Sequence, residues 1–164
     1  MTETATASSL QIRTATKADI PRVAQMVNSA FSVETFLEGT RTDVESLAAT
    51  MSKGEVLVAE DPEGQTLGCI YVEVRGARGY MGMLAVDPAH QGQGLGRLLV
   101  GKAEEILRHA GCQGVDICVL SLRPELLPLY RRFGFVESGT EEFNHGRTFR
   151  EPVECHMVVM SKGL

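Results

Sequence analysis

The chain has 164 residues, of which 43% are hydrophobic and 23% are charged, and its formal net charge is −5. This length and composition indicate one globular domain with a hydrophobic core. A chain without a basic excess offers no surface for a phosphate backbone, so we expect no nucleic-acid partner. No apolar run approaches the roughly 20 residues of a membrane span, so we also expect no membrane partner.

The cysteines and histidines carry no pattern of a reactive or metal-binding site. The four cysteines lack Cys-x-x-Cys spacing and are typical of small buried side chains in a reducing compartment, which predicts a cytoplasmic protein. The four histidines lack metal-ligand spacing, so no metal is expected. Residues 1–9 are rich in Thr, Ala and Ser without a signal-peptide pattern, which predicts a flexible tail before a domain at 10–164.

Hydrophobic periodicity predicts the elements of the first half of the chain. In chain order these are a strand at 10–14, a helix at 19–31, a helix at 43–51, and a hairpin of strands at 56–59 and 66–74. Asp19 is expected to cap the first helix, with Pro21 in its first turn. The run Asp-Pro-Glu-Gly at 61–64 is typical of the turn inside the hairpin.

The second half predicts a strand, helix and strand followed by a further helix and two last strands. The ranges are 80–86, 95–110, 115–119, 124–133, 133–136 and 153–160. A long helical connection suits parallel neighbours, so the strands at 80–86 and 115–119 are expected to be parallel. Pro128 is expected to kink or restart the helix that holds it. The pattern therefore predicts an α/β fold, a mixed sheet flanked by helices.

A glycine-rich bend lies between the strand at 80–86 and the helix that follows it. Gly92, Gly94 and Gly96 allow a tight turn, and the first turn of a helix has unpaired N–H donors at its positive end. Such a bend predicts a site for a phosphorylated ligand. The alternative interpretation is a tight strand-to-helix connection without a ligand.

Two common phosphate loops do not fit this bend. A Walker A loop requires Gly-Lys-Ser/Thr, but Arg97 and Leu98 follow Gly96. A dinucleotide-binding loop requires a third glycine or alanine at position 97, and an acidic residue at the end of the next strand, which ends at Leu120 and Ser121.

The pattern that fits is Gln-x-x-Gly-x-Gly, formed by Gln91, Gly94 and Gly96 after Leu-Ala-Val-Asp-Pro at 84–88. With Leu-Tyr-Arg-Arg-Phe-Gly-Phe at 129–135, it resembles the GNAT superfamily of acyl-CoA-dependent N-acyltransferases over about residues 10–161. The resemblance implies a single-domain GNAT fold with a mixed sheet of six or seven strands. It also implies transfer of an acetyl or short acyl group from acetyl-CoA to a primary amine by direct attack.

The resemblance implies that the loop binds the pyrophosphate of acetyl-CoA through backbone N–H groups, and that the strand before it pairs with the pantetheine arm. The residues expected to bind the co-substrate are Leu84, Ala85, Val86, Gln91, Gly92, Gln93, Gly94, Leu95, Gly96 and Arg97. Arg123 stands where many relatives have an asparagine that contacts pantetheine. Its guanidinium either reaches coenzyme A or is an exposed surface group.

Tyr130 and Glu73 are the residues expected to move protons. Tyr130 matches a tyrosine that protonates the leaving thiolate in many GNAT enzymes, although it also shares a helix face with apolar residues and could be a packed aromatic. Glu73 is the proposed base that deprotonates the amine, or else a solvated strand carboxylate. The glutamate that many relatives carry on the strand at 80–86 is absent.

The acceptor is an amine of a small molecule or of a protein, and the sequence does not identify it. Glu38 and Arg41 lie where GNAT enzymes build the acceptor wall, and Arg41 either binds an acceptor carboxylate or is an exposed surface group. The acceptor-side segments are expected at 31–42 and 138–152. A homodimer through the last strands is a family expectation. A non-catalytic acyl-CoA-binding sensor or scaffold is the alternative function.

Overall fold

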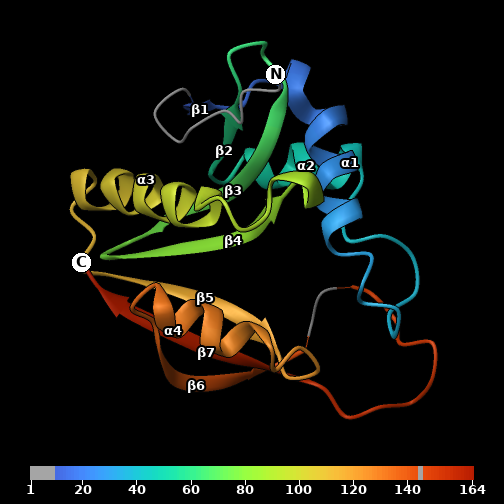
Figure 1. The fold of residues 1–164 in the computed structure, drawn as a ribbon. Helices are drawn as coiled ribbons and strands as arrows, with labels where there is room; N and C mark the ends of the chain where they lie inside the picture. Colours follow the sequence, from blue (N-terminus) through green and yellow to red (C-terminus); the bar gives the residue numbers. More distant parts are fainter. Residues whose placement is uncertain (1–9, 144–145) are drawn as a thin grey trace.

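The computed structural model describes residues 10–143 and 146–164, so the predicted tail at 1–9 lies outside the described residues. Within that part of the chain, seven strands form one mixed sheet, which confirms the predicted fold class (Figure 1). In sheet order the strands are β1 (Gln11–Thr14), β2 (Glu55–Glu60), β3 (Thr66–Arg75), β4 (Arg78–Val86), β5 (Gly114–Leu120), β7 (His156–Gly163) and β6 (Val136–Glu142).

Among the described residues, four α-helices cover the two faces of the sheet (Figure 1). They are α1 (Ile20–Ala30), α2 (Val44–Met51), α3 (Leu95–His109) and α4 (Leu126–Arg132). One core cluster joins α1 and α2 to one face, with Val23 and Leu47 fully buried. The other joins α3 and α4 to the opposite face, with Leu99 and Phe135 at its centre. The two layers therefore enclose the sheet from both sides.

Strands β4 and β5 are parallel neighbours joined by α3, as the sequence predicted, but they pair over only a short stretch. The paired residues are Arg78 with Gly114, Gly79 with Val115, and Tyr80 with Asp116. Beyond Tyr80 no pairing continues, and Figure 1 shows the two strands diverging toward the end of β4 that leads to the glycine-rich bend. The sheet is therefore open between the second half of β4 and the second half of β5.

A β-bulge interrupts β4 at the point where this opening begins. On β3, Tyr71 pairs with Gly82 and Cys69 pairs with Ala85. Two residues of β4, Met83 and Leu84, therefore stand opposite the single β3 residue Ile70. Met83 has φ +49°, a left-handed conformation that is rare for a side chain of this size. The bulge places Met83 and Ala85 in the α1 core, and it directs Leu84 toward the α3 core.

The sequence analysis was wrong about the last part of the sheet. Strand β6 begins only at Val136, the last residue of the predicted range 133–136, and all seven of its residues are exposed. Phe135, placed in that predicted strand, is instead a buried residue preceding β6. Strand β7 begins at His156, three residues later than predicted. A polar edge strand lacks the apolar alternation on which the prediction rested.

Two helix starts also differ from the predictions. Helix α4 begins at Leu126, so Pro124 precedes the helix and Pro128 occupies its third position. A proline in the first turn removes no intrahelical hydrogen bond, and Pro128 therefore neither kinks nor restarts α4. Asp19 is the residue before α1, but its side chain does not cap that helix. Its carboxylate accepts hydrogen bonds from Arg13 and from the Thr16 N–H instead.

We predict that Asp19→Asn destabilises the protein in a pH-dependent manner. The Arg13 hydrogen bonds hold the pKa of Asp19 well below its ordinary value. Its contribution is therefore complete above the ordinary carboxyl pKa of about 4 and disappears as the pH falls through the lower folded value. The variant should lose roughly 1.5–3 kcal/mol of unfolding free energy at pH 7. Urea unfolding at pH 7 and at pH 3 measures the loss, which should shrink at pH 3.

Glu63→Gln, in the exposed hairpin turn, is the matched control and should change stability little at either pH. A loss for Asp19→Asn of equal size at both pH values would contradict the assignment to the ionised carboxylate.

Candidate active site

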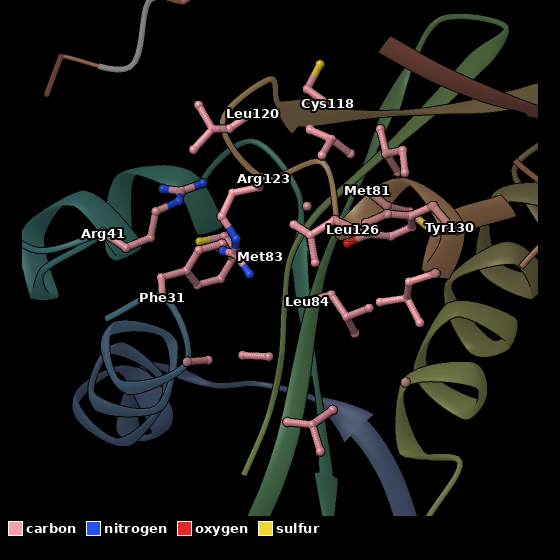
Figure 2. A pocket seen from close by; sticks show the side chains of 18 of the residues that line it. Phe31, Arg41, Met81, Met83, Leu84, Cys118, Leu120, Arg123, Leu126 and Tyr130 are labelled. Atoms are coloured by element: carbon pink, nitrogen blue, oxygen red, sulfur yellow. The ribbon is translucent and has the colours of Figure 1, made fainter. Parts of the chain in front are cut away.

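A pocket of about 620 Å³ occupies the opening between β4 and β5. It extends through the sheet: Figure 2 shows Leu84, Leu126 and Tyr130 on the side of α3 and α4, whereas Phe31 and Arg41 lie on the side of α1. The glycine-rich bend lines the same pocket. We call the first side the loop side and the second the acceptor side.

The bend has the geometry of an anion cradle. Gly92 and Gly94 both have φ +80°, the left-handed region that favours glycine, and Gly94 is the residue before α3. The backbone N–H groups of Gly94 to Arg97 donate no hydrogen bond to any residue within 10–143 or 146–164. A row of free donors at the start of a helix 15 residues long favours a phosphate.

The packing around position 96 would accept a larger residue than the glycine found there. A Cβ built there would lie 3.7 Å from Cζ of Phe133 and 4.0 Å from a methyl carbon of Leu84, which are ordinary van der Waals distances. Gly96 also has a normal helical conformation, since its φ is not positive. The open space above Gly96 belongs to the pocket. The missing side chain therefore favours close approach by a ligand.

Most residues expected to contact the co-substrate line this pocket. They are Leu84, Ala85, Val86, Gln91, Gly92, Gly94, Leu95, Gly96, Arg97 and Arg123. Gln93 is the exception, because it is exposed and contributes nothing to the lining. Arg97 lies 5.5 Å from the centre of the Phe133 ring, so its charge remains near the mouth of the loop. His90 also lines the pocket, and its buried Nδ1 atom has no hydrogen-bond partner in the described part of the chain.

Tyr130 comes from α4 and reaches the pocket between two aromatic neighbours. Its ring makes edge contacts with Phe133 and Phe135, with centroids 6.1 Å apart in each case. Figure 2 shows its hydroxyl directed toward the middle of the pocket. Burial raises the pKa of Tyr130 to about 12, so the phenol keeps its proton throughout the neutral and mildly alkaline range. It is therefore a packed aromatic whose protonated hydroxyl faces the cavity.

Arg123 lines the pocket and is not an exposed surface arginine, since its side chain is only 14% exposed. Its guanidinium pairs with Glu34 at 2.9 Å and with Glu125 at 2.6 Å. Glu34 is only 4% exposed and also lies 3.7 Å from the guanidinium of Arg147. The sequence analysis singled out neither Glu34 nor Arg147. These residues belong to segments more than 80 positions apart, and no local pattern connects them.

We predict that Glu34→Gln strongly destabilises the protein, because it leaves the arginines around position 34 without their carboxylate. Removing one partner of a buried ion pair costs about 3–5 kcal/mol of unfolding free energy. Chemical denaturation measures the loss, and the double variant Glu34→Gln with Arg123→Gln should recover part of it. Glu125→Gln, whose carboxylate is exposed, should cost far less. Equal losses for both glutamates would contradict this assignment.

The two segments expected to form the acceptor side do meet. Leu37 and Phe149 form an isolated β-bridge, and Figure 1 shows the loop after α1 lying beside the chain that leads to β7. The side chain of Asn28 makes two hydrogen bonds of 2.9 Å to the backbone of Thr42, which fixes the position of Arg41. Arg41 lines the pocket, as the acceptor prediction requires.

Glu38 and Glu73 are corrections to the predicted site. The Glu38 carboxylate accepts a hydrogen bond from the Thr148 hydroxyl at 2.8 Å and does not line the pocket. Glu73 is also absent from the lining, since its carboxylate accepts from the Tyr71 hydroxyl and pairs with Arg75. Arg75 lowers the pKa of Glu73, which makes this carboxylate a weaker base than usual. Its cross-strand neighbour Tyr80 lines the pocket instead.

The family is settled by a sequence comparison. The profile of the acetyltransferase (GNAT) domain matches residues 52–137, slightly more than half of the chain. The chain belongs to the GNAT acetyltransferase family. The matched region runs from the end of α2 to the start of β6 and includes the bend and Tyr130.

Curated proteins and solved structures resemble this GNAT chain as well. It is 39% identical over 105 residues to a probable glucosamine 6-phosphate N-acetyltransferase 2 of Oryza sativa subsp. japonica, covering 58% of this chain and 61% of that protein. It is 35% identical over 112 residues to glucosamine 6-phosphate N-acetyltransferase 1 of the same organism, covering 63% and 66%. The chain therefore matches less than two thirds of either relative.

The crystal structure of a ribosomal-protein-alanine N-acetyltransferase from Brucella melitensis superposes with a TM-score of 0.73 at 25% identity, covering 94% of this chain and 99% of that one. The GNAT fold that the sequence predicted is thereby confirmed. Within residues 10–143 and 146–164, no helix is long and apolar enough to span a membrane.

Proposed function

We propose that this GNAT chain transfers an acetyl or short acyl group from acetyl-CoA to a primary amine by direct attack. The observation that supports the proposal most strongly is that one pocket contains both the anion cradle at Gly94 and the hydroxyl of Tyr130. The pocket also passes through the sheet, so donor and acceptor can enter from opposite sides. A site for coenzyme A alone would need neither the tyrosine nor the acceptor side.

The glycine-rich bend and β4 bind acetyl-CoA, and Tyr130 transfers a proton. The thioester of acetyl-CoA supplies an activated carbonyl carbon when it is bound. The free N–H groups at Gly94 to Arg97 bind the pyrophosphate, and the unpaired edge of β4 beyond Tyr80 offers backbone groups to the pantetheine amides. The amine nitrogen bonds to the carbonyl carbon, the carbon–sulfur bond breaks, and Tyr130 gives its proton to the leaving thiolate.

The amine must be neutral to attack, and at pH 7 only about 1 in 2,500 molecules of an ordinary alkylamine is neutral. The single carboxylate lining the described part of the pocket, Glu34, is already paired with Arg123 and lies near Arg147. We therefore propose that no side-chain base is used and that water takes the amine proton. The positive charges on the acceptor side assist by lowering the pKa of a bound ammonium.

The test measures thiol release from acetyl-CoA with a panel of amines, glucosamine 6-phosphate included because the relatives in rice carry that name. Release that depends on an acceptor, with kcat/KM rising with pH up to the pKa of the amine, would support the proposal. Tight binding of acetyl-CoA without release by any amine or peptide N-terminus would favour the sensor or scaffold function. Absence of acetyl-CoA binding in calorimetry would refute both.

A further inference from the structure

The acceptor side of the pocket carries more positive than negative charge. Three arginines line it, Arg41, Arg123 and Arg147, whereas Glu34 is the one acidic side chain among its described lining residues. These arginines come from the loop after α1, the segment before α4 and the segment before β7, so the fold gathers them from distant parts of the sequence. An unbalanced cluster of this kind is costly unless an anion completes it.

The Glu34 carboxylate already interacts with two of these arginines. It pairs with Arg123 at 2.9 Å and approaches Arg147 at 3.7 Å. Arg147 donates further hydrogen bonds of 3.3 Å to the backbone carbonyls of Glu38 and Gly39. Arg147 thus holds the loop that carries Arg41. Arg123 also pairs with Glu125 at 2.6 Å, whereas Arg147 has, among the described acidic residues, only the longer contact with Glu34.

Arg41 has no acidic partner among the residues that the structure describes. Within residues 10–143 and 146–164 it makes no ion pair or hydrogen bond, and its guanidinium lies 5.5 Å from the centre of the Phe31 ring. Figure 2 shows Arg41 and Phe31 together on the acceptor side, with Arg123 reaching in from the opposite wall. Stacking on an aromatic ring fixes the plane of a guanidinium and leaves its N–H groups free to bind a carboxylate or phosphate.

The charges of Arg41 and Arg147 affect each other, which indicates that the two guanidinium groups are close. Burial lowers the pKa of Arg147, Glu34 raises it in part, and the charge of Arg41 lowers it further. An anion placed between Arg41 and Arg147 would remove this repulsion.

We propose that Arg41 and Arg147 form a binding site for an anionic oxygen group carried by the acceptor. The acceptor is then a small molecule that bears both a primary amine and a carboxylate or phosphate. The anion site itself needs only the geometry above, whereas its assignment to an acceptor rests on the proposed acetyltransferase function. The amine of such a molecule extends from the arginines toward the opening between β4 and β5, where the acyl group is delivered.

The first test measures anion binding to protein saturated with coenzyme A, so that the cradle at Gly94 is already occupied. Inorganic phosphate and acetate are titrated separately at constant ionic strength, and calorimetry reports the binding. We expect one of the two anions to bind, and Arg41→Gln to weaken that binding at least about tenfold. The matched control is Arg132→Gln, because Arg132 is exposed at the end of α4 and does not line the pocket. The control variant should bind the anion as the unaltered protein does.

The second test compares amines that differ only in the charged group, namely 2-aminoethyl phosphate with ethanolamine, and glycine with glycinamide. Arg41→Gln should raise KM for the charged member of the preferred pair at least about tenfold and leave the neutral member unchanged, while Arg41→Lys should recover part of the loss.

The outcomes separate the two proposals. If coenzyme A binds but neither anion does, or if Arg41→Gln and Arg132→Gln bind the anion equally well, the anion site is wrong and the acetyltransferase proposal stands. If coenzyme A does not bind, the proposed function fails, and titration of the free protein with the same two variants still decides the anion site. Preference for phosphate or for acetate identifies which anionic group the acceptor carries.

Discussion

Gly96→Ala should weaken the use of acetyl-CoA without harming the fold. Alanine suits a helix better than glycine, and a Cβ at position 96 makes only ordinary contacts, so the variant should gain up to about 1 kcal/mol of unfolding free energy. The added methyl group occupies the space above the cradle and displaces the pyrophosphate. A displacement of about 1 Å costs on the order of 100-fold in kcat/KM, which steady-state kinetics with acetyl-CoA measures.

Gly101→Ala is the matched control for this substitution. Gly101 lies in the same helix, a Cβ there would meet nothing within 4 Å, and the residue does not line the pocket. It should show the same gain in stability with unchanged kinetics. Unchanged kinetics in Gly96→Ala as well would mean that the pyrophosphate does not approach the start of α3.

Tyr130→Phe should lower kcat by about 100-fold, the lower range for the loss of a general acid, while KM for acetyl-CoA changes little. The ring, with its edge contacts to Phe133 and Phe135, is retained, so thermal unfolding should be nearly unchanged. Because the pKa of Tyr130 is raised to about 12, the unaltered enzyme should show no fall in kcat from tyrosine ionisation below about pH 11. Stopped-flow detection of the released thiol measures both effects.

Tyr71→Phe provides the comparison for the loss of a hydroxyl elsewhere. Tyr71 is buried, its hydroxyl donates to Glu73, and it does not line the pocket. This variant should keep its kcat while losing some stability. An unaltered kcat in Tyr130→Phe would remove the general-acid role and leave Tyr130 as a packed aromatic.

The loop side of the site was predictable because its information is local. The glycines, the strand before them and the amphipathic helix after them are consecutive, and each predicts a backbone conformation by itself. The opening between β4 and β5 was different, since it depends on where pairing stops after Tyr80. The resemblance to the GNAT superfamily implied only its consequence, that the strand before the loop pairs with the pantetheine arm.

The acceptor-side segments were expected, but the sequence did not indicate Glu34 and Arg147, because distant parts of the chain bring them together. Glu34 and Arg147 look like ordinary polar loop residues until the fold brings them within 3.7 Å of each other. The prediction of Glu73 as the base did not take account of the partners that its carboxylate has in the fold. Strand alternation correctly placed it on the face shared with Tyr71, but alternation does not reveal that Arg75 and the Tyr71 hydroxyl already occupy its carboxylate.

The bulge at Met83 limits which insertions and deletions the chain can tolerate. Because this one extra residue decides which side of the sheet Leu84 and Ala85 face, deleting it would exchange their environments and shift the glycine-rich bend relative to the sheet. The exposed hairpin turn at 61–64 carries no such constraint. In homologues of this chain, length variation should therefore accumulate in that turn and be absent between 83 and 94.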